Sequence, residues 1–410
     1  MEQITMSDLL SQETKRDPIA FFAHLREQGP LAYLADFNNV GAAWIVTGYD
    51  DALAVLKDPR FIKDRQKLSL PEHGQDSERQ STASQRRFGW RRDMLTVDPP
   101  DHTRLRNLVS KVFTPRVIEQ LRPRIQQITD ELLDAVQDQG KMDLITDFAY
   151  PLPITVISEM LGIPSKDRAQ FRIWTQELIN LPETIQPGIE DAGVSTIEEF
   201  IGYIKTLLAE KRAHPAHDLI SGLVQAEDEG DKLSEQELFS TVFLLIVAGH
   251  ETTVNLIGSG TLALLQHPDQ LRLLRDDPSL IASAVEELLR YTTPVTLATP
   301  RWACEDVTLH DKVIRRGEMV FVSLVGANID SHQFADPASL DLTREENQHL
   351  TFGKGIHYCL GAPLARLEGQ VAFSTLLRRL PHLQLAVEPE HLIWNRTPIL
   401  RGLKSLPVTF

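Results

Sequence analysis

The amino-acid sequence predicts a mainly α-helical fold with a minor β region, on three observations. Apolar residues recur at spacings of three and four over most of the chain, which indicates amphipathic helices. Segments with strand-like composition cluster in two places, near the N-terminus and after residue 300. Strands and helices do not alternate, so a dinucleotide-binding fold is disfavoured. Because no Ser/Gly/Pro-rich linker or internal repeat divides the 410 residues, we expect a single domain over 1–410.

The apolar periodicity places the main helices at about 17–29, 102–112, 114–139, 166–180, 194–213, 235–267, 279–292 and 363–380. The predicted strands are 31–33 with 43–47, and pieces between 301 and 324 that flank turn residues. The longest helix is the best defined. A capping box at Ser234 and Glu237 opens it, and His267-Pro268 closes it.

Composition narrows the classes of function. The chain is 42% hydrophobic, enough for a large core, and 42 Lys/Arg against 57 Asp/Glu give a net charge of −15, which argues against nucleic acid as a partner. Its two cysteines, Cys304 and Cys359, exclude a disulfide framework and indicate a reducing compartment. Residues 1–11 show no signal-peptide pattern, and the longest apolar run, 242–249, is shorter than the ~20 residues of a membrane helix. We therefore expect a cytoplasmic protein without a membrane partner.

The most informative motif is the glycine-rich segment 352–361, which holds Cys359 just before a predicted helix. Its glycines, Gly353, Gly355 and Gly361, are expected to take backbone angles closed to other residues and to let a flat group approach. A cysteine at a helix start is in a position that favours the thiolate. A single thiolate suits one axial bond to a haem iron, although a lone cysteine is more often a small buried hydrophobe.

The spacing Phe352-x-x-Gly355-x-x-x-Cys359-x-Gly361 resembles the haem-binding signature of the cytochrome P-450 family, the haem-thiolate monooxygenases. The resemblance extends from about residue 44 to the C-terminus. It implies the family's fold, with a long central helix over haem b, and it implies that Cys359 is the metal ligand. It also assigns Phe352, Gly353 and Gly361 to cofactor binding.

The centre of the longest helix reads Ala248-Gly249-His250-Glu251-Thr252-Thr253. A carboxylate and two hydroxyls in an apolar helix are costly unless something needs them, although Glu251 pointing outward and Thr252 bonded back to a carbonyl is the alternative. The segment resembles the family's oxygen-activation motif. That resemblance assigns Glu251 and Thr252 to proton delivery during dioxygen activation. It places Ala248 and Gly249 over the haem face.

Other residues complete the resemblance. Glu287-x-x-Arg290, on one helix face, matches a structural pair of the family, for which Arg344 is the candidate third member. By the same resemblance, charge-assisted bonds to the haem propionates come from four cationic residues. These residues are His102, Arg106, Arg301 and His357.

The resemblance implies a monooxygenase that inserts one oxygen atom from O2 into an apolar small molecule, such as a polyketide or macrolide, fatty acid, terpenoid or steroid-like compound. Electrons would come from a ferredoxin or flavodoxin with its reductase, and we expect a monomer. A peroxide-driven haem-thiolate hydroxylase is an alternative, disfavoured because its relatives replace the pair that Glu251 and Thr252 form here. A non-catalytic haem sensor or electron-transfer protein is another, and it leaves these two residues without a purpose.

Two surfaces are candidates for partners. A basic patch for an acidic redox partner is predicted at Arg104, Lys111, Arg116, Arg122, Arg124 and Lys354. Residues 61–92 carry a local charge of +4, from eight Lys/Arg against four Asp/Glu. This segment either meets an acidic substrate group or carrier protein, or is a solvated loop. The resemblance places the substrate-lining regions at about 61–95, 170–200, 241–252, 292–299 and 394–400.

Overall fold

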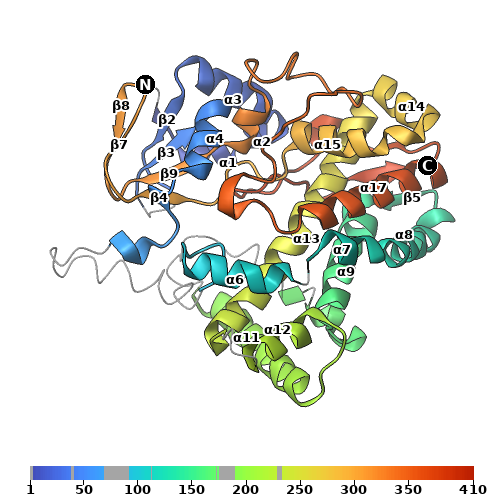
Figure 1. Ribbon diagram of the computed structural model, residues 1–410. Helices are drawn as coiled ribbons and strands as arrows, with labels where there is room; N and C mark the ends of the chain where they lie inside the picture. The colour runs from blue at the N-terminus through green and yellow to red at the C-terminus, as the bar shows by residue number, and fades with distance from the viewer. Residues whose placement is uncertain are drawn as a thin grey trace. The chain divides into compact units, whose positions relative to one another are not determined.

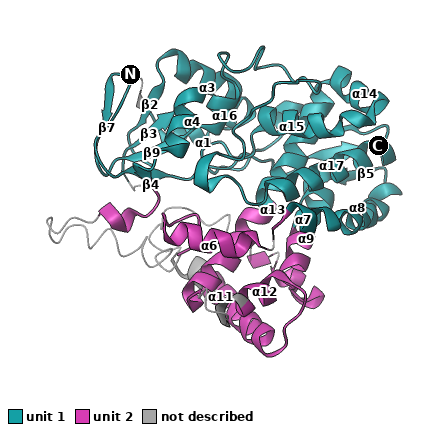
Figure 2. Ribbon diagram, viewed as in Figure 1, with its two compact units in different colours: residues 1–61, 115–153, 251–410 teal, residues 62–114, 154–250 magenta. Residues whose placement is uncertain are grey.

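A computed structural model describes residues 3–37, 41–68, 92–111, 113–171, 173–174, 190–228 and 233–410. Over these residues the chain is mostly helical (Figure 1). Among the described residues, six strands lie in the two parts of the sequence where strands were expected. The sequence did not predict the short strands Gln3–Ile4, Phe61–Ile62, Lys141–Asp143, Gln384–Leu385 and Pro407–Thr409. Contacts group the chain into two compact units (Figure 2). Unit 1 comprises residues 1–61, 115–153 and 251–410, and unit 2 comprises residues 62–114 and 154–250. The single domain expected from the sequence remains a prediction.

Among the residues that the structure describes, unit 1 holds most of the helices and all but one residue of the strands. Its helices are α1 Met6–Leu10, α2 Gln12–Arg16, α3 Pro18–Glu27, α4 Tyr49–Lys57, α7 Pro115–Gln120, α8 Arg122–Gln137, α14 Pro268–Asp276, α15 Ile281–Thr292, α16 Leu324–Asn328 and α17 Ala362–Arg379. Unit 2 holds α6 Asp101–Ser110, α11 Glu190–Ala213 and α12 Leu219–Asp228. Two helices, α9 Pro151–Leu161 and α13 Glu235–Gln266, run through residues of both units.

The largest sheet has six strands in the order β1-β2-β3-β9-β6-β4. Its strands are β1 Gln3–Ile4, β2 Leu31–Leu34, β3 Ala43–Val46, β9 Met319–Val322, β6 Arg301–Ala303 and β4 Phe61–Ile62. The predicted pair β2 and β3 is antiparallel, and β3 pairs in parallel with β9. A three-stranded sheet joins β10 Gln384–Leu385, β11 Pro407–Thr409 and β5 Lys141–Asp143, and β7 Val307–Leu309 pairs with β8 Lys312–Ile314.

Strand β3 is buried on both faces because its side chains alternate between two cores. Trp44 and Val46 join a cluster with residues of α4, whereas Ala43 and Ile45 join a cluster with residues of α3. This alternation is the two-residue period of a strand. It explains why the segment reads as a continuous apolar run in the sequence.

The long helix α13 has the predicted bounds within one residue. The Ser234 N–H donates to Glu237 Oε2 (2.9 Å) and the Glu237 N–H donates to Ser234 Oγ (3.2 Å), so the capping box is present. By length and composition alone the 32-residue helix could cross a membrane, but 72% of its most apolar window is buried inside the protein. A core helix of a soluble protein passes the same test.

One predicted helix is wrong as a single element. The segment 114–139 forms two helices, α7 and α8, interrupted at Leu121. Pro123 explains the break, because a proline supplies no backbone N–H and is tolerated only in the first turn of a helix. The predicted helix 166–180 falls partly outside the described residues.

Candidate active site

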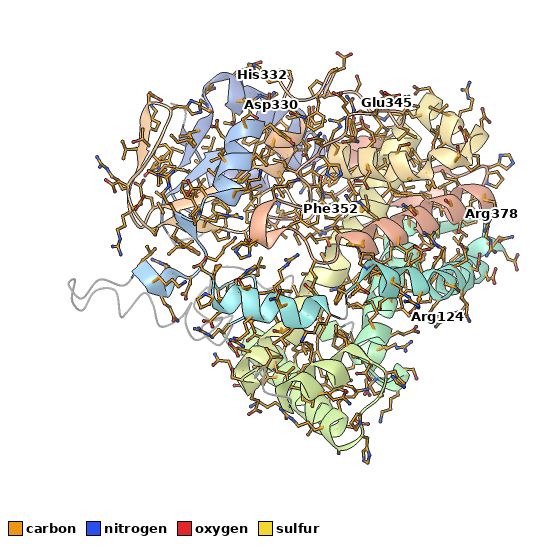
Figure 3. The ribbon with its side chains drawn as sticks, viewed as in Figure 1. Arg124, Asp330, His332, Glu345, Phe352 and Arg378 are labelled. Carbon is orange, nitrogen blue, oxygen red and sulfur yellow. The ribbon has the colours of Figure 1, made fainter. Side chains whose placement is uncertain are left out.

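Cys359 lies in a short loop between a 3₁₀ turn, Gly355–His357, and the start of α17, and its side chain is exposed. The backbone of the loop is closed on itself. The Cys359 N–H donates to the Phe352 carbonyl (2.9 Å), and the Tyr358 N–H donates to the Gly355 carbonyl (3.1 Å). Phe352 is labelled in Figure 3. The loop therefore presents a sulfur atom at the surface of unit 1.

Two of the three loop glycines behave as predicted. Gly353 and Gly355 have φ of 68° and 75°, in the left-handed region that favours glycine. At Gly355 an added Cβ would also lie 2.7 Å from the Leu56 carbonyl oxygen, so a side chain does not fit. The prediction is wrong for Gly361, whose φ is −81°. Gly361 is the N-cap of α17, and a Cβ there would lie 4.0 Å from Cys359 Sγ.

A polar cluster that the sequence did not predict packs against this loop. The guanidinium of Arg366 lies 4.5 Å from the centre of the Phe352 ring and donates to the Tyr358 hydroxyl (3.2 Å). Arg366 is also bound to Glu286 of α15, which accepts from His349 (3.2 Å). Tyr358 directly precedes Cys359, so the cluster contacts the loop at both ends.

The Glu287–Arg290–Arg344 group is confirmed. Arg290 donates to both carboxylate oxygens of Glu287 at 2.8 Å, and both side chains are fully buried. Arg344 reaches the same carboxylate at 3.2 Å. The Arg290 guanidinium also donates to the carbonyls of Asn328, Pro337 and Ser339. The group therefore ties α15 to the chain that leads to the cysteine loop.

The middle of α13 carries an uncovered strip. Ala248 is exposed, and Val247, Glu251 and Thr252 are half-buried, whereas His250 and residues 253–264 are buried. These four positions share one face of the helix, since they are one turn apart. The helix surface along this strip is apolar except at Glu251 and Thr252.

The acid of this strip has an unusual pKa. Burial raises the pKa of Glu251 to about 7, and a hydrogen bond with Asn255 opposes the shift only in part. At neutral pH this carboxyl is therefore present in both protonation states, as an acid–base group requires. Its neighbour His250 is different, because burial lowers its pKa to about 4. The neutral His250 ring donates from Nδ1 to the Ile246 carbonyl (2.8 Å).

Gly249 has a packing reason within unit 2. A Cβ at this position would lie 3.2 Å from Cγ1 of Ile157 on α9, which is tighter than an ordinary contact. The absence of a side chain therefore lets α13 approach α9 closely.

The four predicted cations belong to two groups. In unit 2, His102 and Arg106 lie one turn apart on α6, and His102 is buried. Burial lowers the pKa of His102, and the positive charge of Arg106 acts in the same direction. The negative charge of Asp98 raises this pKa and so opposes both effects. In unit 1, Arg301 is buried at the start of β6 and donates weakly to the Thr299 carbonyl (3.4 Å), and His357 is half-buried in the cysteine loop.

Sequence reasoning missed Glu368, a fully buried carboxyl on α17. Burial raises its pKa to about 8, and a hydrogen bond with Thr253 on α13 opposes this shift. The group is therefore mainly neutral at pH 7. The signal in the sequence is a lone acid among Leu367, Val371 and Ala372, but only the packing of α13 reveals its burial.

The predicted basic patch is smaller than expected. Arg104 is bound to Glu237 (2.5 Å), Arg122 to Glu119 (2.5 Å) and Arg124, labelled in Figure 3, to Glu131 (3.6 Å). Carboxylate partners therefore neutralise three of its members. Arg116 and Lys354, both in unit 1, are exposed.

Most of the basic segment 61–92 lies outside the described residues, as does part of the predicted substrate region 170–200. Among the described members, Lys67 pairs with Asp98 (3.6 Å) and Arg92 pairs with Asp101. The hypothesis of a +4 loop that meets an acidic partner stays a prediction.

Comparison with known proteins decides the family. The family model described as Cytochrome P450 matches residues 28–394. The chain belongs to the cytochrome P450 family. Cytochrome P450 CYP107DY1 of Priestia megaterium is 56% identical over the whole length of both chains. The solved structure of PksS, a cytochrome P450 of the Bacillus subtilis bacillaene polyketide synthase, is 46% identical, covers 98% of each chain and has a TM-score of 0.88.

A second solved structure, the myxobacterial cytochrome P450 CYP267B1 in complex with myristic acid, is 45% identical, covers 98% of this chain and 99% of that one, and has a TM-score of 0.92. The cytochrome P450 fold expected from the sequence is thus confirmed. This cytochrome P450 is a haem-dependent monooxygenase that binds haem b through a thiolate.

The residues of each unit fit a haem. Of the two cysteines, Cys359 is exposed, whereas Cys304 is half-buried. The Cys304 N–H donates to the Arg60 carbonyl (2.8 Å). In unit 1, an exposed sulfur and a buried guanidinium supply the donor types that iron and propionate need. On α13, the exposed Ala248 leaves an apolar surface without bulk. The chemistry of the donor set therefore agrees with the cofactor of the family.

Proposed function

We propose that Cys359 would bind the haem iron through its thiolate and that Glu251 and Thr252 would handle the protons of the reaction. The observation that carries the assignment is the exposed Cys359 sulfur, held in a loop closed by its own backbone bonds. Haem, when bound, supplies an iron that activates dioxygen. The two backbone hydrogen bonds hold the main chain at Cys359 in place, which limits the positions that its sulfur can take.

We infer that the remaining cofactor contacts are of two kinds, polar contacts to the propionates and close packing against the ring. His102, Arg106, Arg301 and His357 bind the two propionates through charge-assisted hydrogen bonds. Phe352, Gly353 and Gly361 border the ring beside Cys359. The exposed Ala248, whose side chain is only a methyl group, and the adjacent Gly249 would border the cofactor from α13, and Ile157 of α9 fills the place that a Gly249 side chain would take.

In this proposal the Glu251 carboxyl moves protons, and the Thr252 hydroxyl orients the water molecule that carries them. A carboxyl with a pKa of about 7 takes a proton from solvent and releases it at nearly equal cost. Asn255, one turn away, donates a hydrogen bond to the ionised carboxylate of Glu251, since this bond lowers the pKa, and it holds the carboxyl on its face of α13. The Thr252 hydroxyl donates one hydrogen bond and accepts others, so it can hold a water molecule in this relay.

For the substrate, we propose an extended apolar molecule of the polyketide or fatty-acyl class. Relatives support this class, because PksS belongs to a polyketide synthase and CYP267B1 was solved with myristic acid. Of the segments proposed to line the site, the structure describes three in full, which are 241–252, 292–299 and 394–400.

Optical titration tests the class. Because haem absorption would report a ligand that binds beside the cofactor, myristic acid or a macrolactone should shift the spectrum at micromolar concentration. If both ligands leave the spectrum unchanged while imidazole binds, the substrate class is wrong but the haem site is not.

We further propose that electrons come from a separate ferredoxin or flavodoxin with its reductase, in the cytoplasm, and that the enzyme works as a monomer. The exposed Arg116 and Lys354 are the basic residues that support docking of an acidic partner. Charge reversal at Lys354 should slow electron transfer and weaken its salt dependence, and the ion-paired Arg124 provides the control.

Product formation with reductant and oxygen, compared with peroxide alone, tests the reaction type.

A further inference from the structure

Two buried cations lie where the N-terminal helix α2 meets a C-terminal hairpin, and the chemistry proposed above uses neither. Lys15 is 2% exposed and Arg401 is 8% exposed. Burial lowers the pKa of Lys15, the charge of Arg401 acts in the same direction, and together they bring it to about 7. Retaining a lysine in such a place is costly. Its hydrogen bonds indicate what the position does.

The hairpin spans residues 394–403 in unit 1. Trp394 and Leu403 form a bridge at its base, where the Asn395 N–H donates to the Gly402 carbonyl (2.9 Å). Its tip is the turn 397–400, in which Thr397 Oγ1 accepts from the Leu400 N–H (3.0 Å). The turn is therefore held internally only by the Thr397 side chain and depends on outside contacts for its position.

Lys15 supplies those contacts on one side. Its Nζ donates to the carbonyls of Thr397 (2.5 Å) and Leu400 (3.0 Å), the two ends of the turn. Arg401 continues the connection, since its Nε donates to the Lys15 carbonyl (2.7 Å) and its Nη1 to the Thr292 carbonyl (3.1 Å). One ammonium group therefore bridges both ends of the turn.

The other side of the turn faces the proposed substrate segment 292–299. The Thr296 N–H donates to the Ile399 carbonyl (2.7 Å), and the Arg401 N–H donates to the Pro294 carbonyl (2.9 Å). Farther along the hairpin, a Cβ on Gly402 would lie 1.8 Å from Asn255 Oδ1. The hairpin is thus packed against α13 at the residue that hydrogen-bonds to Glu251.

We propose that Lys15 is a positioning residue for substrate selectivity, acting through Ile399 at the tip of the hairpin. This inference rests on the proposed function, in which 394–400 lines the site. Because Lys15 donates to both ends of the turn, its loss removes the bond to the Thr397 carbonyl and leaves the Leu400 carbonyl with only the Thr397 hydroxyl (3.1 Å), which lets Ile399 shift. The shift changes the fit of long ligands, whereas ligands too small to reach Ile399 bind as before.

The test compares two iron-binding probes on the purified holoenzyme, imidazole and 1-dodecylimidazole, by optical titration. For Lys15→Met we expect the ratio of their dissociation constants to change by about three- to tenfold relative to the wild type. The spectrum of the reduced carbon monoxide complex stays that of the wild type. The control is Arg16→Met. Arg16 is on the same helix but donates to the Glu390 carbonyl (2.8 Å), away from the turn, and the ratio should stay within about twofold.

A double-mutant cycle with Ile399→Ala separates positioning from a general loss of stability. If Lys15 acts through Ile399, the two effects on the ratio are non-additive. An unchanged ratio in Lys15→Met, or strict additivity, overturns the inference. If Lys15→Met does not accumulate as holoenzyme, Lys15→Gln, which keeps an N–H donor without the charge, is measured in the same way. Failure of the wild type to bind imidazole contradicts the proposed haem site instead.

Discussion

Glu286 and Arg366 form a two-point ion pair behind the cysteine loop. Arg366 Nε lies 2.6 Å from Glu286 Oε1, and Nη2 lies 2.7 Å from Oε2. Burial alone raises the pKa of Glu286, but the hydrogen bonds from Arg366 and His349 outweigh it and hold the pKa at about 2. The carboxylate is therefore charged throughout the physiological range and keeps Arg366 over the Phe352 ring.

Loss of this pair should loosen the cofactor. Glu286→Gln keeps the shape of the side chain but removes the charge, so Arg366 is held more weakly against Phe352 and Tyr358. We expect haem loss to an excess of an acceptor protein to accelerate by about tenfold or more. The exposed pair of Asp306 with Arg315 is the control, and Asp306→Asn should leave the rate unchanged. Equal rates in Glu286→Gln and the wild type would show that the pair does not support the loop.

The buried Glu287–Arg290 pair should control folding. Glu287→Gln leaves the Arg290 and Arg344 guanidinium groups buried without their carboxylate, at a cost of about 3–5 kcal/mol. We expect a large fall in melting temperature and little holoenzyme. Glu119 and Arg122 have the same i,i+3 spacing but are exposed, so Glu119→Gln should leave the melting temperature nearly unchanged. Similar melting temperatures in the two variants would contradict the assigned role.

Close approach at Gly355 predicts a specific sensitivity. Gly355→Ala adds a Cβ 2.7 Å from the Leu56 carbonyl oxygen at a φ of +75°. Gly317, with φ of +87° and open space around it, is the matched control. Gly317→Ala should cost only about 1 kcal/mol of backbone strain. Gly355→Ala should cost more and lower the haem content, measured as the ratio of haem to protein absorbance. Identical haem contents in the two variants would be inconsistent with this contact.

The pKa of Glu251 predicts a pH dependence. Burial raises the pKa of Glu251 from 4.5 to about 7, so between these pH values the folded protein keeps a proton that the unfolded chain releases. The stabilisation of the fold that comes from this proton is fully present below pH 4.5 and is lost as pH rises through 7. If Glu251 delivers protons, wild-type product formation should fall above about pH 7. Glu251→Gln should be slower by roughly a hundredfold and independent of pH there. Glu235→Gln, on the exposed first turn of α13, is the control. A pH-dependent decline that persists in Glu251→Gln would exclude this acid as the source.

The sequence predicted those features whose causes are local. The ends of α13 follow from a capping box and a proline, and the left-handed Gly353 and Gly355 follow from their motif. Features set by distant parts of the chain were missed. Glu368 is mainly neutral because the fold buries it, with Thr253 of α13 among its neighbours. Lys15 is buried where it donates to the carbonyls of Thr397 and Leu400, which are 382 and 385 positions away in the sequence. The Glu287–Arg290–Arg344 group could be predicted because a family resemblance indicated Arg344, which spacing alone did not.

The central claim is that Cys359 binds the haem iron, and the reduced carbon monoxide complex tests it most directly. The spectrum of this complex reports whether a thiolate is the axial ligand. Cys359→Ser should lose the thiolate-type absorption, while Cys304→Ser, at the other of the two cysteines, should retain it. A thiolate-type spectrum that persists in Cys359→Ser, or that disappears in Cys304→Ser, would contradict the account.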